Sequence, residues 1–396
     1  MSEWQTFCLK DLGKIVGGAT PSTNNPKNYG NKIAWITPKD LSTLQGRYIK
    51  KGSRSISRLG FKSCSCVLLP KHAILFSSRA PIGYVAIAKK RLCTNQGFKS
   101  IIPNKKIYFE FLYYLLKYHK DNISNIGGGT TFKEVSGATL GLFKVKIPPT
   151  YYEQQKIART LSILDQKIEN NHKINELLHK ILELLYEQYF VRFDFLDENN
   201  KPYQTSGGKM KFSKELNRLI PSGWSVRFLN HKIVSTYQPK TISKTLLNDS
   251  YSYSVYGGGG IIGRFTEYNY EQSEFIISCR GQCGISYLTL PKSWITGNAI
   301  VIRPTKSYTS KTYLYHTIKK YKLTNYITGS VQPQITRQNL STMPILIPKR
   351  KTLNKWNNIS SLLWNLIHNN MQSTQTLTAL RDFLLPLLLT QQVKPQ

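Results

Sequence analysis

The feature of this sequence that most constrains its fold is an internal repeat with a period of about 200 residues. Residues 74–104 read ILFSSRAPIGYVAIAKKRLCTNQGFKSIIPN, and residues 275–305 read FIISCRGQCGISYLTLPKSWITGNAIVIRPT. The matched positions are Arg79 with Arg280, Gly83 with Gly284, and Pro103 with Pro304. Because both copies read as β-runs broken by glycine, the repeat predicts two domains of the same β-rich fold.

Each copy continues with a short aromatic helix, a glycine turn and a strand closed by proline. The aromatic helices cover residues 111–118 and 313–321. We expect them to pack on their sheets rather than to stack on nucleic-acid bases, because their apolar side chains need a core.

A long helix with coiled-coil spacing follows each copy, since apolar residues recur at alternating intervals of four and three. The first seam consists of Ile157, Leu161, Leu164, Ile168, Asn171, Leu178, Leu182 and Leu185, and the second of Ile359, Leu363, Leu366, Asn370, Leu377, Leu380 and Leu384. Both seams carry asparagine near the centre, which predicts that the helices face each other. The alternative is that each helix packs separately on its own domain.

Helices of one chain that pair in this arrangement run antiparallel. The sequence therefore predicts an α+β fold. Two globular β-rich domains are separated by two long helices that form an antiparallel coiled coil, with a pseudo-two-fold internal repeat. Such a two-fold arrangement is the geometry that symmetric dimers use to contact two sites on one DNA duplex.

Positive charge is concentrated in the two repeated parts of the chain. Residues 1–150 hold 24 basic against 6 acidic side chains, and residues 201–350 hold 21 against 5. Residues 151–200 hold 6 basic against 9 acidic side chains. Charge spread through folded, aromatic-rich sequence predicts a polyanionic partner, most naturally nucleic acid. The alternative is a generally basic surface without a partner.

The sequence gives only weak signals for a membrane segment, a metal site or a cofactor. No apolar run approaches the length of a membrane span, and the N-terminus lacks a signal-peptide pattern, so we expect no membrane contact and a cytoplasmic protein. The cysteines have no zinc-knuckle spacing and are expected to be reduced thiols; they are Cys8, Cys64, Cys66, Cys93, Cys279 and Cys283. The histidines are dispersed. We expect no metal site and no cofactor.

Four consecutive glycines, Gly257 to Gly260, stand in the stretch YSVYGGGGIIGRF. A phosphate-binding loop needs Lys-Ser or Lys-Thr after its last glycine, and a dinucleotide site needs a following helix. Here Ile261 and Ile262 follow, and the sequence after them is β-like. The tract therefore predicts a strand–turn–strand rather than a nucleotide site.

The chain resembles the specificity subunit of Type I restriction-modification systems over nearly its whole length. The stretches that carry the resemblance are VGGATPSTNNPKNYGNKIAWITPKDLS, the helix from IPPTYYEQQ to ELLYEQYF, the linker FDFLDENNKPYQTSGGKMKFSKELNRLIPSGW, and VYGGGGIIG, which is similar to the family's VYGGNGIIG. Gly259 stands where asparagine is usual. We expect the turn to form nevertheless, because glycine accepts positive φ even better than asparagine.

The resemblance implies a non-catalytic DNA-binding subunit that recognises a bipartite target in double-stranded DNA and serves bacterial defence. It also implies partners: two methyltransferase (modification) subunits on the helices, and restriction/translocase subunits in the complex. The implied domains are a first target-recognition domain at 1–151, a central conserved helix at 152–191, a linker at 192–219, a second target-recognition domain at 220–350, and a C-terminal conserved helix at 351–396.

Candidate DNA contacts are side chains suited to phosphates or base edges. In the first domain they are Arg47, Lys50, Lys51, Arg54, Arg58, Arg79, Thr130, Thr131 and Lys133, and in the second they are Tyr256, Arg264, Arg280, Gln282, Gln332, Gln334 and Arg337. The repeat-matched pair Arg79 and Arg280 has a structural alternative, since residues shared by both domains do not explain different sequence preferences.

Two other functions fit a basic, repeated chain. One is a stand-alone nuclease or transposase that uses its repeats as DNA-binding arms, and it predicts metal-dependent cleavage by the isolated chain. The other is a non-specific single-strand binder, which predicts affinity indifferent to duplex and sequence. The sequence lacks the Asn/Asp-Pro-Pro-Tyr/Phe motif of adenine methylation and a phosphate-binding lysine for translocation.

Overall fold

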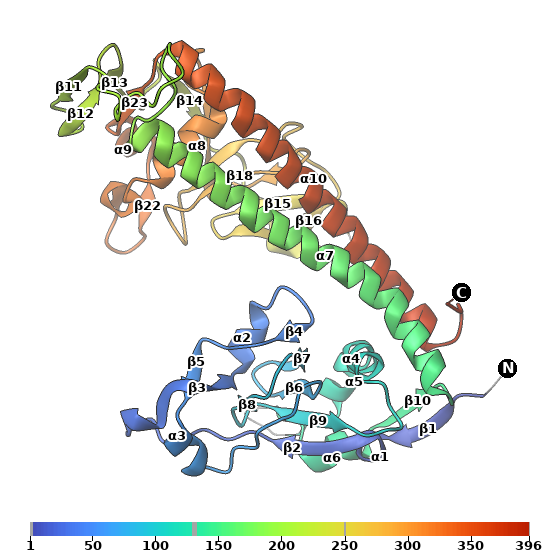
Figure 1. The fold of residues 1–396 in the computed structure, drawn as a ribbon. Helices are drawn as coiled ribbons and strands as arrows, with labels where there is room; N and C mark the ends of the chain where they lie inside the picture. Colours follow the sequence, from blue (N-terminus) through green and yellow to red (C-terminus); the bar gives the residue numbers. More distant parts are fainter. Residues whose placement is uncertain (1–2, 129–132, 249–250, 396) are drawn as a thin grey trace. The chain divides into compact units, whose positions relative to one another are not determined.

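The computed structural model describes residues 3–128, 133–248 and 251–395, and the chain divides into two compact units. The first unit comprises Met1–Lys173 and Asn370–Gln396, and the second comprises Ile174–Asn369. Each unit contains one end of each long helix, α7 (Tyr151–Tyr186) and α10 (Arg350–Leu389) (Figure 1).

The first unit is built around a five-stranded sheet and a three-stranded sheet. The larger sheet has the order β2 (Gly13–Gly17), β9 (Lys99–Pro103), β6 (Ile74–Ser78), β7 (Ile82–Ala88), β4 (Tyr48–Ile49). The smaller has the order β5 (Arg54–Ile56), β3 (Tyr29–Ile36), β8 (Cys93–Thr94). Its short helices are α1 (Leu9–Leu12), α2 (Pro38–Ser42), α3 (Arg58–Lys62), α4 (Phe109–Tyr118), α5 (Lys120–Asn125) and α6 (Gly137–Leu142).

The second unit repeats this plan. Its sheets have the orders β14 (Val234–Tyr237), β20 (Ala299–Pro304), β17 (Phe275–Ser278), β18 (Ser286–Leu288), and β16 (Gly260–Phe265), β15 (Tyr253–Gly257), β19 (Trp294–Ile295). The helices are α8 (Lys311–Lys319) and α9 (Arg337–Ser341), and the unit also contains two hairpins, β11 (Met210–Ser213) with β12 (Arg218–Pro221) and β21 (Ile327–Thr328) with β22 (Gln334–Ile335).

Strand pairing confirms the internal repeat. β3 runs parallel to β8, and β15 runs parallel to β19. The ends of each domain are also joined in the same way. β1 (Gln5–Cys8) is antiparallel to β10 (Lys144–Ile147), and β13 (Ser225–Phe228) is antiparallel to β23 (Pro344–Ile347). A long helix begins a few residues after each closing strand.

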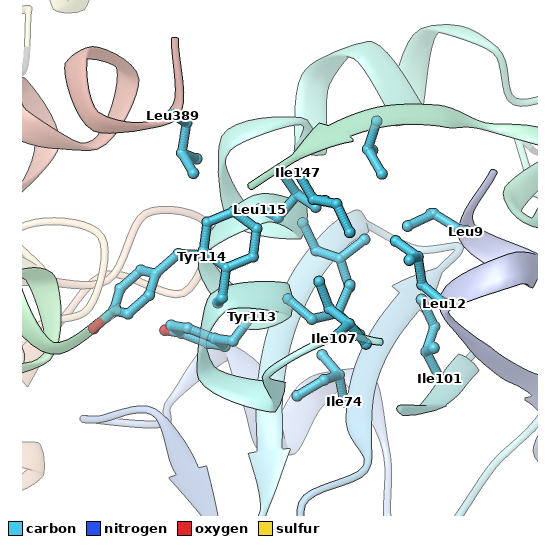
Figure 2. Close-up of a cluster of buried hydrophobic side chains, with 14 of the residues drawn as sticks. Leu9, Leu12, Ile74, Ile101, Ile107, Tyr113, Tyr114, Leu115, Ile147 and Leu389 are labelled. Carbon is cyan, nitrogen blue, oxygen red and sulfur yellow. The ribbon is translucent and has the colours of Figure 1, made fainter. Parts of the chain in front are cut away.

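The aromatic helices pack inside the units, as expected. Residues Phe111 to Leu116 of α4 are all buried, and the helix packs against β6 and β7. Figure 2 shows Tyr113, Tyr114 and Leu115 of α4 in one cluster with sheet residues such as Ile74 and with Leu389 of α10. In the second unit α8 is buried from Thr312 to Ile318 and packs against β17, β18 and β20.

The predicted seam of α7 faces inward. Ile157, Leu161, Ile168 and Leu182 are buried, and the other predicted positions are half-buried, namely Leu164, Asn171, Leu178 and Leu185. Five apolar residues off the seam are exposed instead: Ile163, Ile174, Leu177, Ile181 and Leu184. The four-three spacing therefore identified the inner face of this helix.

The predicted seam of α10 needs a correction. Ile359, Leu366 and Leu380 are exposed, and the buried positions lie one residue later. Ser360 and Ile367 are fully buried, and Arg381 takes the place expected for Leu380. The remaining predicted positions are half-buried: Leu363, Asn370, Leu377 and Leu384. The prediction failed because the inner face of α10 includes polar residues such as Ser360, while apolar residues such as Ile359 and Leu366 are exposed.

The two long helices are antiparallel within each unit. In the first unit the Asn171 amide donates to the Asn370 carbonyl at 3.4 Å and to the Thr374 hydroxyl at 3.2 Å. In the second unit the Asn175 amide donates to the Ile367 carbonyl at 3.3 Å. The central asparagines thus bond across the helix pair, as the seam predicted, and each helix end also packs on its own domain. Within the described ranges, no helix has the length and apolar character of a membrane span.

Candidate nucleic-acid interface

Both units contain the same arginine-bearing turn, here called the arginine turn (residues 77–84 and 278–285). The Ser77 hydroxyl donates to the Pro81 carbonyl at 2.8 Å and accepts from the Tyr84 amide at 2.8 Å. The Ser278 hydroxyl donates to the Gln282 carbonyl at 2.5 Å and accepts from the Ile285 amide at 2.8 Å.

The matched glycines of this turn have backbone angles that favour glycine. Gly83 has φ 101° and Gly284 has φ 85°, both in the left-handed region. A side chain at either position would be strained. The repeat therefore presents Arg79 and Arg280 on the same backbone frame, with Arg79 half-buried and Arg280 exposed.

A further strand segment lies against each arginine turn. The Val135 amide donates to the Ser78 carbonyl at 3.0 Å, and the Ile335 amide donates to the Cys279 carbonyl at 3.0 Å. The residues that precede these amides are Glu134 and Gln334. Glu134 was missed in the sequence, although aligning KEV of the first copy with PQI of the second would have found it.

The glycine tract belongs to the second arginine turn. β15 and β16 pair antiparallel and are joined at Gly258 and Gly259, so the strand–turn–strand forms as predicted. A Cβ at Gly258 would lie 2.4 Å from the Arg280 carbonyl oxygen, so only glycine fits there. The positive φ lies at Gly260 (98°) and not at Gly259. The glycine tract thus allows the β15–β16 turn to lie close to the backbone of the arginine turn at Arg280.

Three loops of the second unit consequently converge: the glycine turn, the arginine turn and the β21–β22 hairpin. An isolated bridge pairs Arg280 with Gln334, and Gln282 lies beside Gly259. Side chains of this cluster that are exposed are Arg280, Gln282, Gln332 and Gln334, and Arg337 is exposed at the start of α9. Guanidinium and carboxamide groups on one surface are suited to hydrogen bonding with base edges and phosphates.

In the first unit a basic loop is exposed. Its cations are Lys50, Lys51, Arg54 and Arg58. The loop is braced by Asp40, whose carboxylate accepts from the Ser53 amide at 2.7 Å and from the Thr37 amide at 2.8 Å. Burial alone would raise the pKa of Asp40, but the bonds from Ser53 and Thr37 lower it below its usual value. An ionised brace keeps the loop in place at neutral pH.

Arg47 does not fit the role predicted for it. Its side chain is only 4 % exposed and pairs with Glu110 at 3.0 Å and Glu169 at 3.4 Å. Burial would lower the pKa of Arg47, but the neighbouring Tyr114 and the carboxylates raise it overall. Its guanidinium joins the domain to α7, because Glu169 lies on that helix. The charge needs those partners and is not available to phosphate.

Two further candidates are engaged inside the fold. Tyr256 is buried, its hydroxyl accepts from the Leu290 amide at 3.1 Å, and burial raises its pKa to about 12. It does not fit the predicted stacking or sugar contact. Arg264 is half-buried and donates to the Tyr251 carbonyl at 3.0 Å. Lys133 is exposed, and Thr130 and Thr131 lie outside the described residues.

The other chemistry-bearing groups are the cysteines and the possible metal ligands. The six cysteines are free thiols, and Cys64 and Cys66 lie with their sulfurs 3.1 Å apart. Over residues 3–128, 133–248 and 251–395, no group of three or more His, Cys, Asp or Glu residues is placed to hold a metal ion. The convergent surfaces consist of basic and amide-rich loops on rigid turns.

Comparisons with known proteins agree with this description. The family model described as the Type I restriction modification DNA specificity domain matches residues 1–180 and 221–379. The MjaIX Type I restriction enzyme specificity subunit of Methanocaldococcus jannaschii is 32% identical, over 98% of this chain and 92% of that protein. The HindI specificity subunit of Haemophilus influenzae is 31% identical over 46% of this chain and 40% of that protein.

Solved structures are also similar over nearly the whole chain. The crystal structure of a Type I restriction-modification S subunit from M. genitalium has a TM-score of 0.61 at 18% identity and covers 97% of this chain and 96% of that chain. At this identity the likeness supports the fold.

Proposed function

The chain belongs to the Type I restriction modification DNA specificity family, and from this premise we propose that it is the DNA-reading subunit of a Type I restriction-modification complex. It recognises a bipartite sequence in double-stranded DNA, one half with each domain, and has no catalytic activity of its own. The observation that carries the proposal is the arginine turn, which is built with the same hydrogen bonds in both units.

The proposed contacts are the exposed side chains of the two loop surfaces, together with the half-buried Arg79. In the first domain (1–151) they are Lys50, Lys51, Arg54, Arg58, Arg79 and Lys133, and in the second (220–350) they are Arg280, Gln282, Gln332, Gln334 and Arg337. Arg47 and Tyr256 are left out because they are buried. The predicted boundaries at 1–151, 152–191, 192–219, 220–350 and 351–396 and the cytoplasmic location remain predictions.

The helices supply the surface proposed for the catalytic partners. Four apolar side chains of α7, Ile174, Leu177, Ile181 and Leu184, are exposed at spacings of three and four. On α10 the exposed apolar side chains are Ile359, Leu362, Leu366, Leu380 and Phe383. Ordered apolar stripes on the surface of a chain with a high net charge are typical of protein interfaces. We assign them to two methyltransferase (modification) subunits, because a reader without an active site needs a catalytic partner; restriction subunits complete the complex.

The test is an exchange of residues 1–150 for the first domain of another family member. Methylated adenines are mapped in the DNA of cells with and without the gene, and with the exchanged version. One half of the bipartite target is expected to change while the other half stays the same. A change in both halves, or in neither, contradicts the proposal. Metal-dependent cleavage by the isolated chain would instead favour the nuclease alternative.

A further inference from the structure

Glu134 and Gln334 occupy the same place on the same backbone. Each is followed by the residue whose amide donates to the arginine turn at 3.0 Å, Val135 in one unit and Ile335 in the other. Each lies beside the turn's arginine: Arg79 Nη1 is 3.7 Å from Glu134 Oε2, and an isolated β-bridge joins the backbones of Arg280 and Gln334. The frame and the arginine are shared, and the neighbouring side chain differs.

This difference matters for recognition. An arginine present in both domains makes the same contact in each half of a target, so it does not distinguish the halves. A side chain that differs between the two domains, on the same backbone arrangement, can distinguish the two halves of a target directly. At 36 % exposure for the Glu134 side chain, and with Gln334 exposed, both are within reach of a ligand on the loop surface.

The charges around Glu134 and Gln334 also differ, in keeping with one side chain being charged and the other neutral. Glu134 Oε1 accepts from Lys99 Nζ at 3.2 Å, so the carboxylate has a cation on each oxygen. In the second unit the position of Lys99 is taken by Ile300, because Ser77 bridges to Phe98 just as Ser278 pairs with Ala299. A carboxylate brought close to DNA phosphates needs neighbouring cations, whereas a neutral carboxamide does not.

We propose that Glu134 and Gln334 are base-reading residues of the first and second domain, which rests on the proposed function above. Each Glu134 oxygen keeps a lone pair beyond its cation and accepts from the amino group of cytosine. Gln334 both accepts and donates, which matches the paired edge atoms of adenine. Arg79 and Arg280 hold the adjoining phosphate in both halves.

The experiment is selection of binding sequences from a randomised duplex by the full chain, comparing the wild type with Glu134→Gln and Gln334→Glu. Glu134→Gln is expected to change one position of one half-site from cytosine to adenine. Gln334→Glu is expected to change one position of the other half-site from adenine to cytosine. The preference for the original base should fall by roughly 5- to 150-fold, the range of one good base contact. Glu3→Gln, an exposed glutamate of the same unit, is the matched control and leaves both halves unchanged.

Each other outcome is decisive. Unchanged half-sites in both variants overturn the inference, and so does a uniform loss of affinity with the same bases selected, which is what a structural role for the Lys99–Glu134–Arg79 group would produce. A change of both half-sites by one variant also overturns it. Failure of the wild type to select any bipartite duplex instead contradicts the proposed function.

Discussion

At the residue scale, the arginine of each arginine turn is proposed to contribute affinity for DNA, and the neighbouring Glu134 or Gln334 to contribute sequence specificity. Arg79 and Arg280 stand on frames closed by Ser77 and Ser278 and are proposed to contact phosphates. Replacing either by alanine should weaken binding to all duplex sequences about equally and reduce the salt dependence by about one counterion. The measurement is the slope of binding affinity against salt concentration. Arg192→Ala, an exposed arginine outside the turns, is the control. A variant that relaxes one base position would show that its arginine reads a base.

The same scale shows the limit of pattern reading. The basic loop predicted from its density of cations is exposed at Lys50, Lys51, Arg54 and Arg58, but its first arginine is not. Arg47 and Arg54 look alike in sequence, and only the fold brings Glu110 and Glu169 to Arg47 from distant positions. Burial of a charge with its partners is a tertiary property, so the sequence predicts the loop and not the fate of each cation.

At the element scale, the two long helices were predicted with different success. The predicted seam positions of α7 are all buried or half-buried, whereas on α10 the inner face includes Ser360 and Arg381 in place of predicted apolar positions. Arg381 is paired with Asp165 of α7 at 2.8 Å, a contact that only the three-dimensional arrangement explains. Periodicity therefore predicted the existence and pairing of the helices, and the register of α10 depended on polar contacts.

Adjacent residues of α10 test the corrected register. Ile367 is fully buried and Leu366 is 44 % exposed. Ile367→Asp should destabilise the second unit by about 3 kcal/mol or more, because it places a charge in a packed seam. Leu366→Asp should leave the free energy of unfolding within about 0.5 kcal/mol of the wild type. It should, however, reduce co-purification of the modification subunit. Equal destabilisation by both variants would contradict the register.

Burial of histidine makes the helix packing of the second unit sensitive to pH. His316 of α8 stacks on Tyr186 of α7, and burial, aided by the charge of Lys319, lowers its pKa to about 3. The pKa values of His368 and His179 are lowered as well, mainly by burial. The unfolded chain binds protons below pH 6.5, the ordinary value, while the folded state does not until about pH 3. The contribution of these buried histidines to the free energy of unfolding is therefore complete above pH 6.5. It falls as the pH drops from 6.5 towards 3.

We expect His316 alone to remove up to about 1.4 kcal/mol of unfolding free energy per pH unit across the lower part of that window. Urea unfolding between pH 7.5 and about 4, followed by tryptophan fluorescence, measures it, since the Trp356 ring centroid lies 5.3 Å from that of His316. His316→Phe, which keeps an aromatic ring but does not titrate, should make the pH dependence shallower. An equally steep dependence in this variant would assign the effect to other groups.

At the scale of the whole molecule, the helices connect the two readers along the chain. α7 contains 36 residues, which corresponds to a length of about 54 Å. That exceeds one turn of DNA, about 34 Å, so a target in two separated halves is expected. The repeat and its two basic parts predicted this organisation from the sequence alone, because periodicity and net charge are global properties that individual misplaced residues do not change.

A matched pair of insertions tests the helices as a spacer. Seven residues added after Leu178 of α7 and seven added after Leu363 of α10 keep the heptad phase and lengthen each helix by about 10 Å. The spacer between half-sites should grow by about three base pairs, with both half-sites unchanged. Methylation mapping reads the result. An unchanged spacer with full activity would show that the helices do not set the distance.

The two-stranded sheets β1–β10 and β13–β23, which join the first and last strands of each domain, have a consequence for how such a protein evolves. Gln5 pairs with Ile147 where the first domain begins and ends, and Ser225 pairs with Ile347 in the second. Since entry and exit of the chain are adjacent, a gene segment that encodes everything between them can be replaced in one recombination event while the two-stranded sheet and the helices are kept. We therefore expect new target sequences to arise by exchange of whole inserts between relatives, without stepwise substitution of a recognition surface.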